Sequence, residues 1–348
     1  MPEESITMSS PLVSVIVVNW NGKEHLEECL CSLRSQTFSD FEAILVDNGS
    51  TDGSVEYIQG NFADWVRILK NARNEGFSGG NNRGIREARG KYIALLNNDA
   101  RADAHWLEEL VRIAEDNPRV GMLACKIYLQ EKLKILDNTG HLIYPDGLNR
   151  GRGRLEVDRG QYEKLEEVFF PSGCASLYRR TMLKEIGLFD EDFFAYGDDT
   201  DIGLKGRMAG WKCLYVPQAL VYHRFSQSSG TYSPLKAFYV ERNRVWIAIK
   251  YFPLSLLLRS PFYTFWRFLL QSYGALTGRG AAGKFSREYS CWQLLRILIE
   301  AYVSALQGLP KMWKKRKEIK KLTRVNAEEI LGWFHRFRMS AREISLKE

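Results

Sequence analysis

Residues 13–22 read VSVIVVNWNG, a continuous run of apolar, mostly β-branched residues that stops at polar side chains. Such a run is typical of a strand buried on both faces, as in a parallel sheet. The pattern returns twice in the first hundred residues, as FEAILV at 41–46 before DNGS and as YIALL at 92–96 before NND. Between them, a shorter strand is expected at Val66–Leu69 and helices are expected at Lys23–Ser35 and Gly79–Gly90.

These alternating elements predict an α/β fold with a Rossmann-like sheet flanked by helices. The carboxyl ends of parallel strands meet at one edge of the sheet, and ligands bind in the crevice beyond that edge. Asn19, Asp47 and Asp99 each stand at or just after the end of a predicted strand. We therefore expect the three side chains to face one shared crevice.

The second half of the chain has two different characters. Residues from 119 to 180 alternate again, so further strands are expected there, with a Gly- and Arg-rich loop between 145 and 165. After Glu241 the chain becomes apolar, but no uncharged stretch reaches the ~20 residues that a membrane-spanning helix requires. Cys291–Leu309 has its polar residues on one narrow stripe at helical spacing. Lys311–Glu348 contains 12 Lys or Arg and 5 Asp or Glu, which accounts for the whole net charge of +7 of the 348 residues.

Apolar helices beside a basic cluster are typical of a segment that lies on an anionic membrane surface. The alternatives are a helical hairpin packed on the rest of the protein and a dimer interface, which would make the protein a homo-oligomer. Because the positive charge is confined to the tail, a general nucleic-acid binder is disfavoured. The six cysteines show no framework spacing, which indicates a reducing compartment, and the acidic start MPEESITMSS predicts no signal peptide.

Three aspartates, Asp198, Asp199 and Asp201, stand together in the run FFAYGDDTDIGLKGRMAGW. Carboxylates this close repel one another, so such a cluster usually persists because a cation or a proton transfer requires it. The alternative is an Asp-rich turn that caps the next helix, and this is the favoured interpretation for Asp201. Aromatic residues that favour a cleft for a ring-shaped ligand flank the cluster: Phe193, Phe194, Tyr196 and Trp211.

Two further segments suit a nucleotide diphosphate. Asn71–Gly84 (NARNEGFSGGNNRG) combines glycine, which lets backbone approach a ligand, with asparagine, which donates and accepts hydrogen bonds. It is not a P-loop, since no Gly-Lys-Ser/Thr follows, and the alternative is an ordinary loop and helix start. Asn97-Asn98-Asp99 offers one carboxylate and amide oxygens, which suit Mg²⁺ held partly by ligand phosphates. His223 would add a nitrogen ligand and favour Mn²⁺, although a single histidine is more often structural.

Seven segments, in this order, resemble family 2 glycosyltransferases, the inverting enzymes with the GT-A (nucleotide-diphospho-sugar transferase) fold. They are VSVIVVNWNG, DNGSTDGS, NEGFSGGNNRG, LLNNDA, PSGCASLYRR, FDEDFFAYGDDTDIGLKGRMAGW and VYHRFSQSSG, within residues 12 to 250. This resemblance implies a Rossmann-like mixed sheet flanked by helices. The rhamnosyltransferase-like subgroup, which builds polysaccharides on lipid-linked acceptors, is the most similar. The expected division is an N-terminal tail at 1–11, a GT-A domain at 12–245 and a helical, basic, membrane-associating region at 246–348. Within the domain, 12–118 would be the nucleotide-sugar-binding half and 119–245 the acceptor and catalytic half.

The resemblance implies a role for each matched residue. Asp199 would be the general base, with Asp198, which stands where the family has Glu, as its orienter or an acceptor contact. Asp99 would bind the metal that bridges the donor diphosphate, and His223 would join the metal or the diphosphate. Asn97 replaces the first Asp of the family's metal motif. The donor would contact Asn19, Asp47, Asn74, Gly76 and Asn98, and the acceptor would lie near Cys174, Phe194, Tyr196 and Trp211.

Together these features predict an inverting glycosyltransferase in cell-surface polysaccharide synthesis, peripheral on the inner face of the cell membrane. It would move a sugar from dTDP-rhamnose or a UDP-hexose to a hydroxyl of a lipid-linked or polysaccharide acceptor. One base and no protein nucleophile predict a single displacement, and Mg²⁺ or Mn²⁺ would neutralise the leaving diphosphate. The alternatives are a non-catalytic sugar-nucleotide-binding scaffold and a sugar nucleotidyltransferase, which would need a basic Gly-rich loop after the first strand. The motifs leave the donor sugar, acceptor and linkage open.

Overall fold

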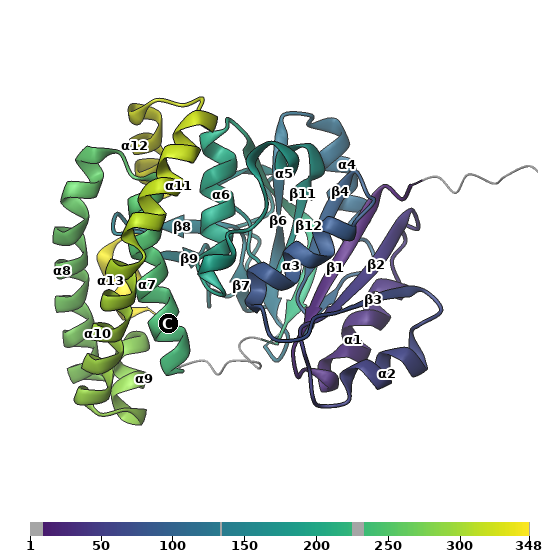
Figure 1. Cartoon of the computed structure of the whole chain (residues 1–348), viewed down its shortest axis with the longest axis horizontal. Helices are drawn as coiled ribbons and strands as arrows, with labels where there is room; N and C mark the ends of the chain where they lie inside the picture. Colours follow the sequence, from purple (N-terminus) through teal and green to yellow (C-terminus); the bar gives the residue numbers. More distant parts are fainter. Residues whose placement is uncertain (1–9, 133, 225–232, 348) are drawn as a thin grey trace, which may run out of the picture.

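The apolar runs of the first hundred residues form the parallel part of one large sheet (Figure 1). The computed structural model describes residues 10–132, 134–224 and 233–347. Within them the sheet has ten strands in the order β10-β12-β6-β11-β4-β1-β2-β3, with β5 beside β12 and β7 beside β6. The strands are β1 (Val13–Asn19), β2 (Phe41–Asp47), β3 (Val66–Lys70), β4 (Tyr92–Leu96), β5 (Ala100–Ala102), β6 (Val120–Leu129), β7 (Leu136–Asn138), β10 (Glu166–Val168), β11 (Ala175–Arg179) and β12 (Lys212–His223).

The sheet is mixed. β1 pairs in parallel with β2 and β4, and β2 pairs in parallel with β3. β11 runs antiparallel between β4 and β6 and so joins this part to a second parallel pair, β6 and β12. The expected mixed α/β sheet is confirmed, and the four predicted strands of the first hundred residues begin at the predicted residues.

Helices cover both faces of the sheet, which explains the uninterrupted apolar runs. In β1, Val13, Val15 and Val17 pack with residues of α1 and α4, whereas Ile16 packs on the opposite face with residues of α3, α5 and α6. β1, β2 and β4 therefore bury both sets of alternating side chains along most of their length. The helices are α1 (Lys23–Arg34), α2 (Ser54–Asn61), α3 (Gly76–Glu87), α4 (Trp106–Asp116), α5 (Arg180–Ile186) and α6 (Asp198–Met208).

The C-terminal region is helical, as expected, and packs on the sheet domain through its own hydrophobic core. Phe169, Phe170 and Phe193 of the first part meet Trp246 of α7 and Phe334 of α12 in this core. Residue 245, the expected domain boundary, lies inside α7. The helices are α7 (Pro234–Tyr251), α8 (Leu254–Thr277), α9 (Gly280–Glu288), α10 (Cys291–Gln307), α11 (Leu309–Leu322), α12 (Ala327–Arg336) and α13 (Ala341–Leu346), and a hairpin of β8 (His141–Ile143) and β9 (Asn149–Gly151) lies beside them (Figure 1).

One helix differs from its predicted bounds, and another contains an internal proline, each for a local reason. α3 begins at Gly76, three residues early, because Asn74 Oδ1 accepts the Gly76 N–H at 2.8 Å and supports the first turn. α8 contains Pro261 in its interior. A proline leaves the carbonyl four residues earlier without its usual partner, and Ser260 Oγ donates to that carbonyl, of Leu257, at 2.9 Å.

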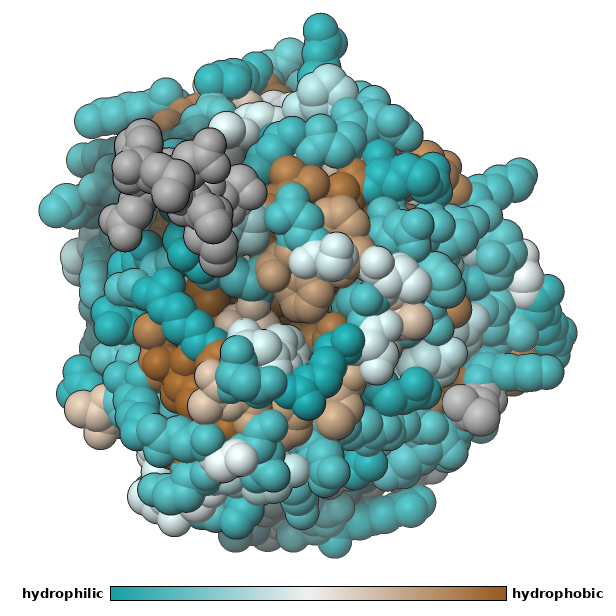
Figure 2. Space-filling view, turned by 90° about the vertical axis from the view of Figure 1, so that its right-hand side faces the viewer, coloured by the Kyte–Doolittle hydropathy of each residue, from teal (hydrophilic) through white to brown (hydrophobic). Residues whose placement is uncertain are grey.

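The surface is uneven in polarity. On the end of the molecule beside β1–β3, the surface is largely hydrophilic and hydrophobic residues gather mainly around a central hollow (Figure 2). At the opposite end, α8 and α10 expose many large apolar side chains. Among the described residues, no helix combines the length and the apolar character that crossing a bilayer requires.

Candidate active site

The predicted donor residues meet at the carboxyl edge of β1, β2 and β4, but two of them are buried below it. Asn19, at the end of β1, is fully buried and accepts a hydrogen bond from Asn98 Nδ2 at 2.7 Å. Asp47, at the end of β2, is 3% exposed and accepts the Ser50 N–H at 3.1 Å. Neither side chain lines the cavity of this structure, whereas Asn98 does. In this structure Asn19 and Asp47 therefore position their neighbours.

Asn48, which the sequence analysis did not select, organises the other donor residues. Its Nδ2 donates to Asn74 Oδ1 at 3.0 Å and to the Gly76 carbonyl at 3.0 Å, and its Oδ1 accepts from Asn71 at 2.9 Å. Asn48, Asn74 and Gly76 all line the cavity. Gly76 has φ +72°, and a Cβ there would meet the Phe194 carbonyl oxygen at 2.2 Å, so no other residue fits without displacing that loop.

The predicted metal residues lie side by side. His223, at the end of β12, lines the cavity, and its Nε2 lies 3.3 Å from Oδ1 of the buried Asp99. Its Nδ1 lies 2.8 Å from Asp137 Oδ2, another residue that the sequence analysis missed. Burial lowers the pKa of His223, but Cys174, Asp137 and Asp99 together raise it well above its ordinary value.

These residues fit a divalent cation that a diphosphate ligand helps to hold. Asp99 Oδ1 is buried and faces His223 Nε2 at 3.3 Å, so a carboxylate oxygen and an imidazole nitrogen are the ligand atoms that the chain offers here. Imidazole Nε2 stands beside it, and a carboxylate on the other ring nitrogen is the arrangement that orients ligating histidines. Within the described residues no group of three or more acidic, Cys or His side chains has metal-binding geometry. A cation here would thus depend on ligand oxygens, as Mg²⁺ usually does.

The two acids predicted for catalysis begin α6 and line the same cavity. Burial and the neighbouring Asp199 carboxylate hold the pKa of Asp198 well above its usual range. Asp199 Oδ1 accepts the Thr200 N–H at 2.7 Å, and Asp199 Oδ2 lies 3.6 Å from His141 Nε2. His141 belongs to β8 and is stacked on Phe170 at 4.9 Å. It was not predicted, because nothing near it in the sequence connects it to the acid cluster.

Asp201 lies in the first turn of α6, as favoured from the sequence, but it binds another helix and does not cap its own. Its side chain is fully buried in the first turns of α6, where it forms an ion pair with Lys250 and accepts from the Tyr251 hydroxyl at 2.7 Å. Both partners come from α7. The third aspartate therefore fixes α6 against α7 and leaves the two preceding acids at the cavity wall.

A strained loop carries the predicted acceptor residues. Phe194 and Tyr196 both have φ +64°, a conformation that costs aromatic residues energy and recurs at functional sites. Asn243 of α7 holds the loop, since its Nδ2 donates to the carbonyls of Ala195 at 2.9 Å and Tyr196 at 2.6 Å. Phe194 and Tyr196 line the cavity.

Trp211 does not line this cavity, and the expectation that it contacts an acceptor is corrected by the structure. Its ring packs against Gly121, and its indole N–H donates to Glu185 Oε2 at 3.0 Å. The residue follows α6 by one turn, so it lies at the far end of that helix from the acid cluster. Trp211 is close to the acid cluster in sequence, but the length of α6 separates the two in space.

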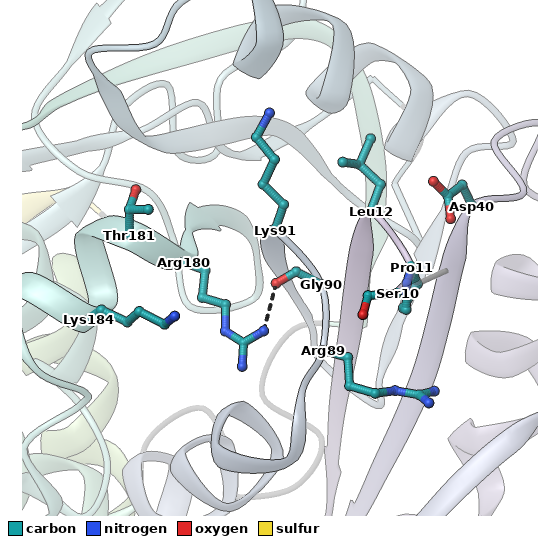
Figure 3. A pocket seen from close by; sticks show the side chains of 10 residues that line it. All are labelled: Ser10, Pro11, Leu12, Asp40, Arg89, Gly90, Lys91, Arg180, Thr181 and Lys184. Carbon is teal, nitrogen blue, oxygen red and sulfur yellow. Dashed lines mark hydrogen bonds between the residues drawn. The ribbon is translucent and has the colours of Figure 1, made fainter. Parts of the chain in front are cut away.

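The cavity that collects these residues has a volume of about 1140 Å³. A second cavity, of about 340 Å³, lies at the other edge of the sheet, before β1 and β4 and beside α5 (Figure 3). Its basic side chains include Arg89, which pairs with Glu42, and Arg180, which donates to the Gly90 carbonyl at 3.3 Å. None of the predicted site residues lines it. The candidate site is therefore the larger cavity.

Residues 225–230 of the last matched segment lie outside the described residues.

The profile of the family described as Glycosyl transferase family 2 matches residues 14–187, half of the chain and most of this sheet. The chain belongs to this family. The match covers the predicted donor residues and Asp99, and ends before Asp199 and His223.

Curated relatives of this family 2 member include proteins named as glycosyltransferases. The uncharacterized protein y4gI of Sinorhizobium fredii is 30% identical over 237 residues, which cover 64% of this chain and 25% of that protein. The uncharacterized glycosyltransferase EpsJ of Bacillus subtilis is 30% identical over 230 residues, 65% of this chain and 64% of EpsJ. The N-acetylglucosaminyl-diphospho-decaprenol L-rhamnosyltransferase of Mycobacterium tuberculosis is 28% identical over 249 residues, 63% and 78% of the two chains. The chain thus spans a quarter of the first relative and just under two thirds of the second.

Solved structures confirm the GT-A fold expected of this family 2 member. A mannosyltransferase of Pyrobaculum calidifontis, in complex with GDP-Man and Mn²⁺, superimposes with a TM-score of 0.54 at 17% identity and covers 88% of this chain and 89% of its own. GalNAc-T7, with UDP, GalNAc and Mn²⁺, superimposes with a TM-score of 0.59 at 17% identity and covers 87% and 59%.

Proposed function

We propose that this chain is an inverting glycosyltransferase that moves a sugar from a nucleotide-diphosphate donor to a hydroxyl of a lipid-linked acceptor. One observation carries the proposal: the Asp199 carboxylate lines the same cavity as His223, whose ring contacts Asp99, and as the Asn48–Asn74–Gly76 cluster. A carboxylate that accepts the hydroxyl proton and a separate place for a diphosphate are the two requirements of a single displacement. The Mycobacterium tuberculosis relative, by its name, transfers rhamnose to a diphospho-decaprenol acceptor.

In this proposal each group has a limited task. Asn48, Asn74 and Gly76 bind the nucleoside end, while Asn19 and Asp47 hold that wall in place. Asp99 and His223 would hold Mg²⁺ or Mn²⁺, which would supply charge neutralisation for the leaving diphosphate. Asp199 accepts the hydroxyl proton, and Asp198, whose raised pKa favours the protonated form, donates a hydrogen bond within the acceptor pocket. Phe194 and Tyr196 border the acceptor sugar. The donor is dTDP-rhamnose or a UDP-hexose.

Donor binding is the direct test of this proposal. In a thermal-shift screen of sugar nucleotides with Mn²⁺ or Mg²⁺, the correct donor should raise the melting temperature, because a ligand that binds only the folded state stabilises it by mass action. Asp99→Asn should abolish the metal-dependent part of the shift. The exposed Asp116→Asn, at the end of α4, is the matched control and should keep it. If no sugar nucleotide produces a shift or is hydrolysed, the protein is not this enzyme.

We also propose that the protein works on the surface of the membrane that carries its acceptor. The outer faces of α8 and α10 expose a broad apolar surface, far beyond the scattered apolar residues of an ordinary surface. The basic helix α11 follows α10 and suits anionic headgroups. The apolar surface comprises Leu254, Leu258, Phe262, Phe265, Trp266, Leu269, Tyr273, Leu276, Trp292, Leu295, Ile299, Val303 and Leu306.

Vesicle binding tests this localisation. At low salt the protein should sediment with phosphatidylglycerol vesicles, and Phe262→Asp, at a position 68% exposed on α8, should lower the bound fraction because it places a charge in the apolar contact. Leu165→Asp introduces the same charge at a site 47% exposed beside β10 and should leave binding unchanged. Equal loss in both variants would mean that only net charge matters, and no loss in Phe262→Asp would refute the assignment of this face.

A further inference from the structure

The large cavity continues beyond the acid cluster into the C-terminal helices. Its wall includes residues of α8, α9, α10 and α13, none of which belongs to the sheet domain. The volume of about 1140 Å³ exceeds the ~300–1,000 Å³ of usual small-molecule sites. We call the helical part the apolar arm, and its defining residues are Phe268, Ala275, Phe285, Leu294, Leu298 and Ile344.

The arm is built from the inner faces of these helices. On α10, Leu294 and Leu298 lie one turn apart on the side that continues to Ala301 and Ala305, which are fully buried. The adjacent Ile299, 54% exposed, points to the outer surface instead. α13 closes the other side, where Ser345 Oγ donates to the Arg267 carbonyl of α8 at 3.4 Å. The apolar lining is therefore separate from the exposed apolar surface of the same helices.

Three cationic side chains line the same cavity, and we call Arg150, Arg154 and Lys236 together the neck. Arg150 of β9 lines the cavity and donates to the Glu343 carbonyl of α13 at 3.0 Å, so it joins the two parts. Lys236 of α7 lies 5.5 Å from the centre of the Tyr196 ring. Arg154 forms an ion pair with Asp137 at 2.5 Å and also lines the cavity. The cavity thus has Arg154 and Lys236 beside the catalytic residues and Arg150 beside α13, whose Ile344 belongs to the arm.

We propose that the apolar arm binds the hydrocarbon chain of a lipid diphosphate, with the diphosphate at the neck and the attached sugar at Asp199. The inference rests on the proposed function for the sugar end alone. The order of the walls matches such a molecule, since an uncharged chain needs an apolar enclosure and a diphosphate needs cations. A free glycan would need polar partners along the whole cavity, whereas the lining of α8, α9, α10 and α13 is mostly apolar, with Gln271, Ser272 and Lys347 as polar exceptions.

Binding of prenyl diphosphates to the full-length protein tests the proposal without donor or transfer. Geranylgeranyl diphosphate should bind at least about tenfold more tightly than geranyl diphosphate, which has half its chain, and inorganic pyrophosphate should compete poorly with either. Ala275→Trp and Leu298→Trp fill the arm and should each weaken geranylgeranyl diphosphate binding about tenfold. Their neighbours give matched controls: Leu276→Trp and Ile299→Trp, at positions 89% and 54% exposed, should bind like the parent.

Each contrary result overturns the proposal in a defined way. Equal binding of the two chain lengths means that the arm does not hold the chain. Equal weakening by Ile299→Trp and Leu298→Trp places the chain on the outer face. A variant counts as folded when its melting temperature and its donor-induced thermal shift equal those of the parent. If only one of the two arm variants, Ala275→Trp or Leu298→Trp, is folded, its binding result alone tests the proposal. If no sugar nucleotide binds but geranylgeranyl diphosphate still binds more tightly than geranyl diphosphate, only the proposed function is refuted. If a sugar nucleotide binds but the two prenyl diphosphates bind equally well, only this inference is refuted.

Discussion

Replacing Asp199 by asparagine should abolish sugar transfer while leaving donor binding intact. Asparagine keeps the size of the side chain, and its carbonyl oxygen still accepts the Thr200 N–H that Asp199 Oδ1 accepts at 2.7 Å. It does not accept a proton from an acceptor hydroxyl. Loss of a general base typically lowers the rate by about 10²–10⁴-fold. Single-turnover transfer and the donor-induced thermal shift, measured on the same preparation, separate the two steps.

Asp198→Asn is the informative comparison. Because burial and Asp199 raise the pKa of Asp198, its protonated carboxyl already resembles a carboxamide, and we expect a much smaller loss of transfer. If the two variants lose activity equally, the acids act as one unit. Full transfer by Asp199→Asn would show that the base lies elsewhere in the cavity.

Replacing Arg267 by methionine should cause the largest loss of stability of any single change considered. Arg267 is fully buried, and its guanidinium contacts Asp146 Oδ2 at 2.7 Å and Glu241 Oε1 at 2.8 Å. Removal of the guanidinium leaves the buried carboxylates of Asp146 and Glu241 without one of their positively charged partners. Breaking a buried pair costs about 3–5 kcal/mol. The same substitution at the exposed Arg259, two turns earlier on α8, should change the unfolding free energy by less than about 0.5 kcal/mol.

The ion-pair network around Arg267 also makes the stability of the fold fall at acidic pH. Burial alone would raise the pKa of Glu241, but Arg267 and Arg244 lower it to about 2. A carboxylate with a lowered folded-state pKa stabilises the fold above its unfolded pKa of about 4.3, and this contribution is lost as the pH falls toward 2. The difference in melting temperature between the parent and Arg267→Met should therefore shrink in that interval. An unchanged difference would show that Glu241 does not supply the effect.

The sequence predicted those parts of the site that follow from short-range patterns. The strand ends placed Asn98 at the cavity because burial on both faces leaves a clear apolar run, whereas Asp99 is buried and contacts His223, which lines the cavity. It did not predict that Asn19 and Asp47 lie beneath the cavity wall, because depth at a strand end depends on the side chains packed above it. Trp211 was misplaced because neighbourhood in sequence does not give direction along a helix.

The missed residues share a different cause. Asp137 and His141 lie in short strands with no recognisable motif, and each gains meaning only from a partner more than fifty residues away, His223 and Asp199. Asn243 stands in the run ERNR, whose charge is typical of a solvated helix face. The run is buried because Asp146 and Arg267 supply its partners. Long-range pairing of this kind is invisible in a single sequence.

The hydrogen bonds from Asn243 to the Phe194–Tyr196 loop predict which segments must be kept together when domains of related enzymes are exchanged. The loop that we propose to border the acceptor is kept in its costly conformation by Asn243 of α7, and Trp246 of α7 in turn packs in the core of the C-terminal helices. A chimera that joins the sheet domain of one homologue to the C-terminal helices of another would take the Phe194–Tyr196 loop from one protein and the residue at position 243 from the other. Recombination would preserve the acceptor pocket only when α6, the loop and α7 are inherited as one block, so acceptor choice should travel with that block and not with the donor half.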